Sequence, residues 1–186
     1  MVDPTAPTAR ELAMATDTES SDADSRTNGA TVNVSGIEAG ASWEYSSDNG
    51  TSWTAGGSAG ANGMSSVEQA ATFDGTVIAR QTDSAGNQSA SSTGLQVVVD
   101  TTAPTAPTLA LATDTGSSDS DSLTNDATVN VSGIEAGASW EYSTDNGSSW
   151  TDGTTVDANG MSSLELAATF DGTVIARQTD SAGNQS

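Results

Sequence analysis

The chain has 186 residues, neither cysteine nor histidine, and a formal net charge of −21 from 25 acidic residues and four arginines. Nucleic acids and anionic lipids are bound through clusters of Lys and Arg, which this composition cannot form. No apolar run reaches the length of a membrane span. We therefore expect no nucleic acid and no direct membrane insertion, and we expect cations as partners. Without cysteine, no disulfide can stabilise a small domain.

An internal repeat organises the chain. When the sequence is shifted by 97 positions, residues 3–89 align with residues 100–186 without a gap, and 17 of the 87 aligned positions differ. A repeat of this length is one folding unit copied. We predict two domains, residues 3–99 and residues 100–186, whose charges are −9 (12 acids, three arginines) and −12 (13 acids, one arginine). Neighbouring identical repeats in the same chain are the expected protein partners.

Short strands are expected in both copies. Val32 and Val34 alternate with polar neighbours, and this period of two is typical of a strand with one buried face. Asn146 and Gly147 tolerate the positive φ of a tight turn, so Asp145-Asn146-Gly147 predicts a hairpin. The strands expected in the second copy are residues 107–113, 128–133 and 139–143, a short strand that carries Trp150, and residues 162–169 and 173–179.

The first copy has one further strand. Leu95, Val97 and Val99 alternate directly before Asp100, and we expect this strand to close the first domain by pairing with the strand of Val77. The second copy has no counterpart of residues 90–99, which predicts an unfilled sheet edge able to recruit a neighbouring chain. Short strands, regular turn signals and the lack of a helical period together favour an all-β chain of two antiparallel β-sandwiches.

Two pairs of equivalent residues have alternative roles. Trp43 and Trp140 could be exposed platforms that stack on a ligand, but a Trp on the third strand of a small sandwich more often fills the core. We expect the core position. Arg80 and Arg177 could hold a substrate carboxylate. We expect each to form an ion pair with a nearby acid instead, the usual role of an isolated Arg.

Three motifs carry a family resemblance: Val99-Asp-Thr-Thr-Ala-Pro104, Asp114-Thr-Gly, and Asp180-Ser-Ala-Gly-Asn184. With them the chain resembles the bacterial immunoglobulin-like extender repeats of giant, calcium-dependent surface adhesins that are secreted by the type I route and carry nonapeptide calcium repeats. The resemblance implies two tandem immunoglobulin-like antiparallel β-sandwich domains of about seven strands each, stacked into a stalk with calcium at the junctions. It also implies an extracellular place on a bacterial cell surface. The first copy departs from the pattern at Pro4, where the second has Thr101.

The acidic loops contain the hard oxygen ligands that Ca²⁺ prefers. They lack the turn glycine and closing Glu of an EF-hand, so a site must collect ligands from several loops. The candidate calcium ligands are Asp3, Asp17, Asp22, Asp24, Asp74, Asp83 and Asn87 in the first copy, and Asp100, Asp114, Asp119, Asp121, Glu135, Asp180 and Asn184 in the second.

The sandwich topology predicts which of these loops share an end of a domain. Residues 17–28 and the turn at Asp74 are expected at the end of the first domain nearest the linker. Glu135 and residues 180–184 are expected at the corresponding end of the second domain, with Asp100 between them. Carboxylates gathered there would repel without a cation, so we expect Ca²⁺ to bind at the junction and stiffen it. The alternative is a solvated acidic surface.

That alternative is the one we expect for the remaining acids, such as Asp48 and Glu44. Enzymatic functions are disfavoured, because without His and Cys the commonest general bases and nucleophiles are missing. A glycosidase needs an acid in an apolar pocket, whereas these acids lie in loops rich in Ser and Gly. The chain is therefore predicted to be no enzyme.

Two non-enzymatic functions are left. The first is a structural extender that projects a distal ligand-binding domain from a bacterial cell and is stiffened by calcium. The second is a calcium-dependent module that itself binds a glycan or another ligand through Trp53 and Trp150. Near-identical tandem copies favour the extender, because each copy then performs the same mechanical task, although an avidity array also repeats its modules.

Overall fold

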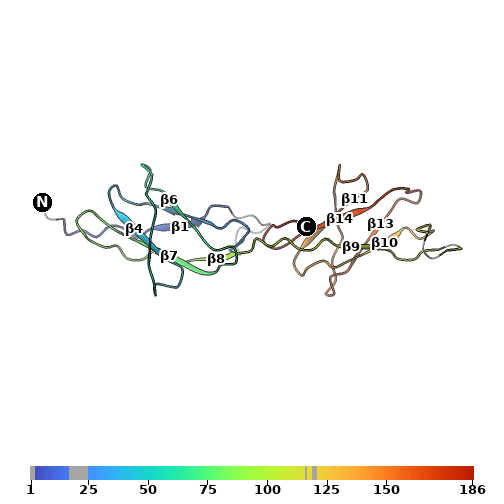
Figure 1. Cartoon of the computed structure of the whole chain (residues 1–186), viewed down its shortest axis with the longest axis horizontal. Coiled ribbons are helices and arrows are strands. Elements are labelled where there is room, and N and C mark those ends of the chain that lie inside the picture. Colours follow the sequence, from blue (N-terminus) through green and yellow to red (C-terminus); the bar gives the residue numbers. More distant parts are fainter. Residues whose placement is uncertain (1–2, 17–24, 116, 119–120) are drawn as a thin grey trace. The chain divides into compact units, whose positions relative to one another are not determined.

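The computed structural model describes residues 3–16, 25–115, 117–118 and 121–186, and it contains two compact units, Met1–Thr101 and Thr102–Ser186. Both units are built from strands (Figure 1), and the described residues form 14 of them. Among the described residues there is no helix long and apolar enough to cross a membrane. The candidate ligands Asp17, Asp22, Asp24 and Asp119 lie outside the described residues.

The first unit is a sandwich of two sheets. One sheet has the order β1-β3-β6, and the other has the order β2-β8-β7-β4-β5. All neighbours are antiparallel except β2 and β8, which are parallel. This arrangement is that of an immunoglobulin-like sandwich. The strands are β1 (Glu11–Met14), β2 (Arg26–Thr27), β3 (Thr31–Ser35), β4 (Ser42–Ser46), β5 (Thr54–Ala55), β6 (Ser65–Glu68), β7 (Asp74–Thr82) and β8 (Leu95–Val99).

The core of this unit follows the predicted alternation. Val32 and Val34 of β3 are fully buried, while their neighbours in the strand are not. Trp43 on β4 is 5% exposed, so the prediction that it fills the core is confirmed. The strand predicted at the end of the first copy also forms, because β8 pairs with β7 and places Leu95 opposite Val77 (Figure 1).

The second unit repeats the fold in part. One sheet has the order β13-β10-β9 and the other β12-β11-β14. Within the described residues of this unit no strand corresponds to β2 or β8. Trp140, the counterpart of Trp43, is 3% exposed and also in the core. The strands are β9 (Thr108–Leu111), β10 (Thr128–Ser132), β11 (Ser139–Ser143), β12 (Thr151–Asp152), β13 (Ser162–Glu165) and β14 (Ile175–Thr179).

Several strand limits in the second copy differ from those predicted. β9 starts one residue later and ends two residues earlier than the strand expected over residues 107–113, and β10 ends one residue earlier than residue 133. The strand expected over residues 162–169 ends at Glu165, because Phe170 donates its backbone N–H to Ala167 and closes a turn. The strand expected from residue 173 begins at Ile175, and the short strand begins just after Trp150. The hairpin at Asn146 forms as predicted, with φ of 57° there and 84° at the following glycine.

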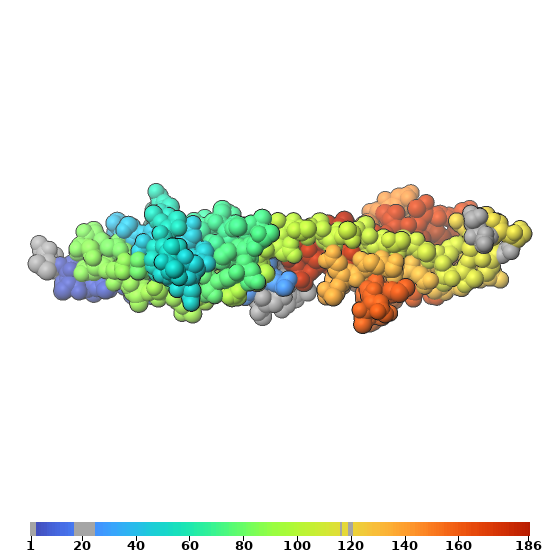
Figure 2. Space-filling view, turned by 60° about the horizontal axis from the view of Figure 1, so that its bottom comes forward, coloured from blue at the N-terminus to red at the C-terminus, as the bar shows by residue number. Residues whose placement is uncertain are grey.

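The loop between β5 and β6 and its counterpart between β12 and β13 project from the surfaces of their units, as the teal and dark orange segments of Figure 2 show. Four of the 17 positions that differ between the two copies are the consecutive residues 57–60 of this loop. The positions that differ thus concentrate in a projecting segment, whereas β3, β4 and β7 have the same sequence as their counterparts.

Candidate functional site

A hollow of about 210 Å³ lies at one end of the first unit. Asp3, Glu38 and Asp83 all line it, so three acidic residues from three separate segments of the chain meet there. Two of them, Asp3 and Asp83, are among the predicted calcium ligands. Glu38 was missed in the first copy, although its counterpart Glu135 was predicted, and the repeat itself is the signal that could have found it.

A buried glutamine holds this end of the unit together. Gln81, on β7, is fully buried, and its Oε1 accepts the backbone N–H of Glu38 at 3.0 Å. Its Nε2 donates to the carbonyl of Thr8 at 3.2 Å. Gln178 repeats the first of these contacts with Glu135 at 2.8 Å. A buried polar group needs such partners, and here they fix the loop that carries the glutamate.

The loop from Asp83 to Asn87 is stabilised by its own aspartate. Oδ1 of Asp83 accepts the backbone N–H groups of Ala85 and Asn87, each at 2.8 Å, and Oδ2 accepts Nδ2 of Asn87 at 2.8 Å. The hydrogen bond from the Asn87 side chain is the main reason that the pKa of Asp83 is lowered. Asn87 also donates to the carbonyl of Asp3 at 2.8 Å, which ties the start of the chain to this loop.

The equivalent loop of the second unit has the same geometry. Oδ1 of Asp180 accepts the backbone N–H groups of Ala182 at 2.8 Å and Asn184 at 2.9 Å, and its Oδ2 accepts Nδ2 of Asn184 at 2.9 Å. Both aspartates therefore have a structural role. A carboxylate has further lone pairs, so these bonds leave each one able to bind a cation as well.

The oxygen donors at these loops suit Ca²⁺ chemically. However, in the part of the chain that the structure describes, no three acidic side chains come close enough together to form a ready metal site. The hollow brings three acids to one place without arranging them as a cage. Calcium binding at these residues stays a prediction.

The other described candidate ligands are dispersed. Asp74 begins β7 and accepts Nε2 of Gln96 at 3.3 Å. Asp114 accepts the backbone N–H of Ser122 at 3.2 Å, and Asp121 that of Leu123 at 3.1 Å. The backbone N–H of Asp100 donates to the carbonyl of Thr27 at 3.0 Å, next to the end of β8.

Asp48 is exposed and Glu44 is partly buried, and both acids also have partners within the fold. Glu44 pairs with Arg80, whose Nε lies 2.6 Å from its Oε1. Oδ1 of Asp48 accepts the Ser46 hydroxyl at 2.7 Å and the Ser52 backbone N–H at 2.8 Å, and Oδ2 accepts the Ser52 hydroxyl at 2.6 Å. These bonds, chiefly that from the Ser52 hydroxyl, lower the pKa of Asp48 to about 2.

The predicted ion pairs of the two arginines are confirmed, and each arginine has a second contact. The guanidinium of Arg80 lies 3.8 Å from the centroid of the Trp53 ring, and that of Arg177 lies 3.8 Å from the Trp150 ring. Arg177 pairs with Glu141 at 2.8 Å. One face of each predicted ligand-binding Trp is thus already covered by a cation, so that face is closed to a stacking sugar.

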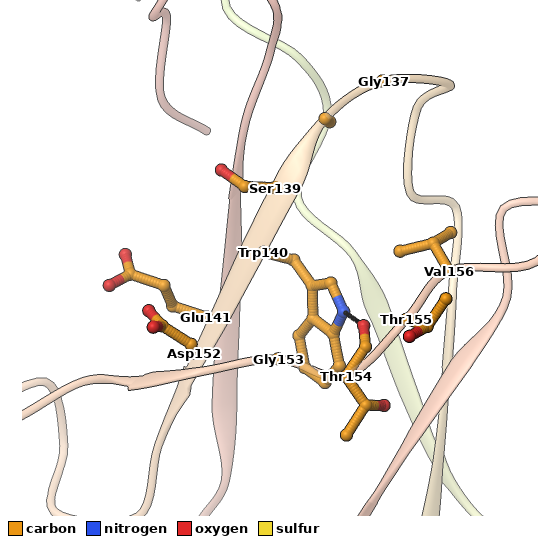
Figure 3. A pocket seen from close by; sticks show the side chains of 10 residues that line it. Gly137, Ser139, Trp140, Glu141, Asp152, Gly153, Thr154, Thr155 and Val156 are labelled. Carbon is orange, nitrogen blue, oxygen red and sulfur yellow. Dashed lines mark hydrogen bonds between the residues drawn. The ribbon is translucent and has the colours of Figure 1, made fainter. Parts of the chain in front are cut away.

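A shallow depression of about 670 Å³ surrounds Trp140 in the second unit (Figure 3). The ring itself is buried, and its Nε1 donates to the carbonyl of Thr154 at 2.9 Å. Gly153 passes directly beneath it, where a Cβ atom would come within 2.0 Å of the ring. Glu141 and Asp152 lie on the other side of β11 from the ring (Figure 3). The depression therefore presents neither an exposed aromatic face nor a converging set of polar groups.

No protein-family model matches the chain, and no curated protein matches it. The human OSCAR ligand-binding domain aligns with 98% of this chain over 96% of its own, at 14% identity and a TM-score of 0.37. The chicken CNTN1 FN1–FN3 domains align with 96% over 64% of their chain, at 10% identity and a TM-score of 0.36.

A biofilm associated protein, represented by its BSP domain, aligns with 86% of this chain over 26% of its own, at 16% identity and a TM-score of 0.31. At this level the likeness to all three structures is one of fold, and it transfers no partner or activity to this chain.

Proposed function

We propose that the chain is a pair of structural extender repeats from a bacterial cell-surface adhesin, a non-enzymatic and extracellular segment that holds a distal ligand-binding domain away from the cell. The observation that carries this proposal is the way the two copies differ. Core strands β3, β4 and β7 have sequences identical to those of their counterparts, whereas residues 57–60, in the projecting loop after β5, hold four of the 17 differences. The function of a spacer depends on the folded core of each repeat and does not depend on the sequence of any one surface loop.

The state of the surface side chains supports a spacer over a binding module. Trp53 and Trp150 are each covered on one face by an arginine. Asp48 and Asp145 are held by hydrogen bonds within their own turns. Residues that would otherwise serve recognition thus stabilise the unit to which they belong.

The proposal includes Ca²⁺. In the first unit Asp3, Glu38 and Asp83 line one hollow, and the repeat places Asp100, Glu135 and Asp180 at the equivalent sequence positions. Carboxylates and backbone carbonyls are ligands of Ca²⁺ in extracellular modules, which bind it at roughly 10⁻⁴ to 10⁻³ M. A calcium ion on the second set would join the linker residue Asp100 to two loops of the repeat that follows. We propose that this limits bending at the linker.

The test measures small-angle scattering and thermal unfolding of the 186-residue chain in millimolar Ca²⁺, in Mg²⁺ and in chelator. Of the three conditions, we expect only Ca²⁺ to raise the unfolding temperature of the chain and to narrow the distribution of its maximum dimensions in solution. A ligand at about ten times its dissociation constant stabilises the bound state by about 1.4 kcal/mol. The variant Asp100→Ala should lose most of this response. Asp152→Ala is the matched control, because the counterpart of Asp152 is already Ala55.

If Ca²⁺ changes neither the unfolding temperature nor the dimensions of the native chain, calcium has no part in the function. If Asp100→Ala responds to Ca²⁺ as strongly as the native chain, Asp100 is not a ligand and this assignment of the site is wrong. The spacer function is tested separately by glycan-array binding of the native chain and of Trp150→Ala. Specific glycan binding that is lost in Trp150→Ala would replace the spacer with the binding module.

A further inference from the structure

The hairpin turns after β4 and after β11 each contain one polar side chain that the fold does not use. Oδ2 of Asp48 accepts the Ser52 hydroxyl at 2.6 Å, and its backbone carbonyl accepts the Thr51 hydroxyl at 3.0 Å. Asn49, in the same turn, is exposed, and no described residue forms a hydrogen bond with its side-chain amide. The same holds for Asn146 in the second unit. Both amides are therefore open to a partner outside the chain.

The turn explains the asparagine but not the residue two positions later. The φ angle is 58° at Asn49 and 57° at Asn146, in the left-handed region that Asn, Asp and Gly adopt most readily. An Asn-Gly pair therefore suits both hairpins for backbone reasons alone. The backbone at positions 51 and 148 has no such restriction, since φ is not positive there. Both copies nevertheless have an exposed hydroxyl residue at this position.

The hydroxyl is kept although the residue changes. The first copy has Asn-Gly-Thr from Asn49, and the second has Asn-Gly-Ser from Asn146, so this position is one of the 17 that differ. Asn-x-Ser/Thr, where x is not proline, is the acceptor sequence of N-linked glycosylation. Each hairpin thus combines this acceptor sequence with an exposed amide that has no partner among the described residues.

The acceptor sequence is short and occurs three times in each copy, so its structural context has to distinguish one occurrence from another. It begins at Asn33, Asn49, Asn87, Asn130, Asn146 and Asn184. A transferase must reach the amide nitrogen and must bind the three residues of the acceptor sequence as one accessible segment. The fold meets these two conditions in the hairpin turns, and it fails at least one of them at each of the other four positions.

Two of the other asparagines lie inside strands. Asn33, on β3, lies opposite Ala13 of one neighbouring strand and Ser66 of the other, and the next residue, Val34, is fully buried. Asn130 has the equivalent position on β10, between β9 and β13. Backbone that is paired on both sides in the core of a domain opens only at a cost close to that of global unfolding. These two segments are therefore inaccessible in the folded chain.

In the remaining two, the amide nitrogen is already bonded. Nδ2 of Asn87 donates to Oδ2 of Asp83 at 2.8 Å, and Nδ2 of Asn184 donates to Oδ2 of Asp180 at 2.9 Å. In the first unit the hydroxyl residue of this acceptor sequence, Ser89, is also buried. Both amides help to hold their own loops, so a transferase would have to disrupt the loop before it could react.

From these observations we propose that Asn49 and Asn146 are sites of N-linked glycosylation, and that the fold selects them over the other four asparagines. The donor is a sugar activated as a glycosyl diphosphate. Nδ2 of the asparagine forms a bond to the anomeric carbon of the sugar while the bond from that carbon to the diphosphate oxygen breaks. The diphosphate leaves with the bonding electrons, and one amide proton passes to a base of the transferase. Each unit then carries one glycan on the same hairpin turn.

The experiment treats the folded 186-residue chain with two kinds of donor. One arm uses a soluble asparagine glycosyltransferase with a nucleoside-diphosphate hexose, and the other uses a membrane oligosaccharyltransferase with a polyprenyl-diphosphate oligosaccharide. Peptide mass spectrometry locates the attached sugars. We expect one glycan on each of Asn49 and Asn146 in at least one arm, and the arm that reacts identifies the carrier of the donor sugar.

Variants separate the acceptor sequence from the turn. Asn49→Asp with Asn146→Asp keeps residues that tolerate the left-handed turn but removes the amide nitrogens, so both glycans should be lost. Thr51→Ala with Ser148→Ala keeps both amides and the turn asparagines, and it should also lose both glycans. Thr51→Ser is the matched control and should retain its glycan, because the second copy already has serine at this position.

Three outcomes would overturn the proposal. The first is the absence of glycan in both arms. The second is a glycan on Asn33 or Asn130 of the folded chain at the level found on Asn49, because the fold would then not select the site. The third is full glycosylation of Thr51→Ala with Ser148→Ala, because the hydroxyl residue would then have no part in recognition.

Discussion

The guanidinium of Arg80 lies 3.8 Å from the centroid of the Trp53 ring while its Nε donates to Glu44 at 2.6 Å. Glu44 is on β4, Arg80 is on β7, and Trp53 directly precedes β5. The three side chains therefore link the edge strand β5 to its two nearest neighbours in the five-stranded sheet. The second unit repeats the stack: Arg177 lies 2.8 Å from Glu141, and its guanidinium lies 3.8 Å from the centroid of the Trp150 ring.

Replacement of both Arg80 and Arg177 by Ala should destabilise each unit by about 1 kcal/mol, since a partly exposed cation–π contact and a surface ion pair contribute amounts of that order. The emission of Trp53 and Trp150 should shift to the red as the rings become solvated. Urea unfolding followed by Trp fluorescence measures both effects. Lys at both positions keeps the charge but loses the planar stack, so it should recover only part of the stability. Full recovery would show that the ring contact contributes little.

Two neighbouring glycines close to the core residue Trp43 should differ strongly in how far replacement by Ala lowers the stability of the first unit. A Cβ on Gly56 would come within 2.0 Å of the Trp43 ring, whereas a Cβ on Gly57 meets nothing nearer than the Ser65 hydroxyl at 3.8 Å. Gly56→Ala should therefore destabilise the first unit by about 1 to 3 kcal/mol, the usual effect of overpacking. Gly57→Ala is the control and should be close to neutral, because its counterpart is already Thr154. Equal unfolding midpoints for the two variants would contradict this reading of the core.

Gln81 links the core to the acidic hollow, and its removal should affect both. Gln81→Leu leaves the backbone N–H of Glu38 and the carbonyl of Thr8 without their partner. An unsatisfied buried group is destabilising by about 1 to 3 kcal/mol. We expect a loss in that range by urea unfolding, together with faster amide exchange at Glu38. Gln88→Leu is the control, because Gln88 is exposed and should tolerate the change. Unchanged exchange at Glu38 would show that the glutamine does not hold that loop.

The hairpin aspartates predict a dependence of stability on acid. Hydrogen bonds, first from the hydroxyls of Ser52 and Ser149, lower the pKa of Asp48 and Asp145 to about 2 from an ordinary 3.8. Because the folded pKa lies below the unfolded one, this stabilisation is complete above about pH 4 and is lost as the pH falls towards 2. Urea unfolding across this range measures it.

Variants separate these aspartates from the other acids. In Asp48→Asn with Asp145→Asn, the fall in unfolding midpoint between about pH 5 and about pH 2.5 should be smaller than in the native chain. Asp152→Asn, at an exposed position, should retain the native fall. An identical fall in all three proteins would assign the acid sensitivity to other groups.

The sequence was enough to predict the sandwich, because alternation at Val32 and Val34 and the Asn-Gly turns determine strands and hairpins locally. The end of β13 was mispredicted, since the apolar alternation continues to Phe170 and only the backbone turn there ends the strand. The stack of Arg80 on Trp53 depends on the pairing of distant strands, which no local pattern encodes.

The role of Asp48 did have a local signal. A serine stands two residues before it and another four residues after it, and this spacing allows one aspartate to accept bonds from both. No local sequence signal within one copy indicates that Asp3, Glu38 and Asp83 line the same hollow. They lie in three separate segments, and only folding of the sandwich brings these segments together.

The position of β8 between β2 and β7 also sets the order in which a repeat can mature. Synthesis delivers a chain progressively, and a domain can complete its fold only once its last strand has been made. Thr27 pairs with Val99, a residue made 72 positions later, so the sheet stays open at its centre until nearly the whole repeat is present. Long-range pairing of this kind is slow. The first unit therefore stays pliable until its final strand has been made and becomes rigid only when β8 enters the sheet between β2 and β7.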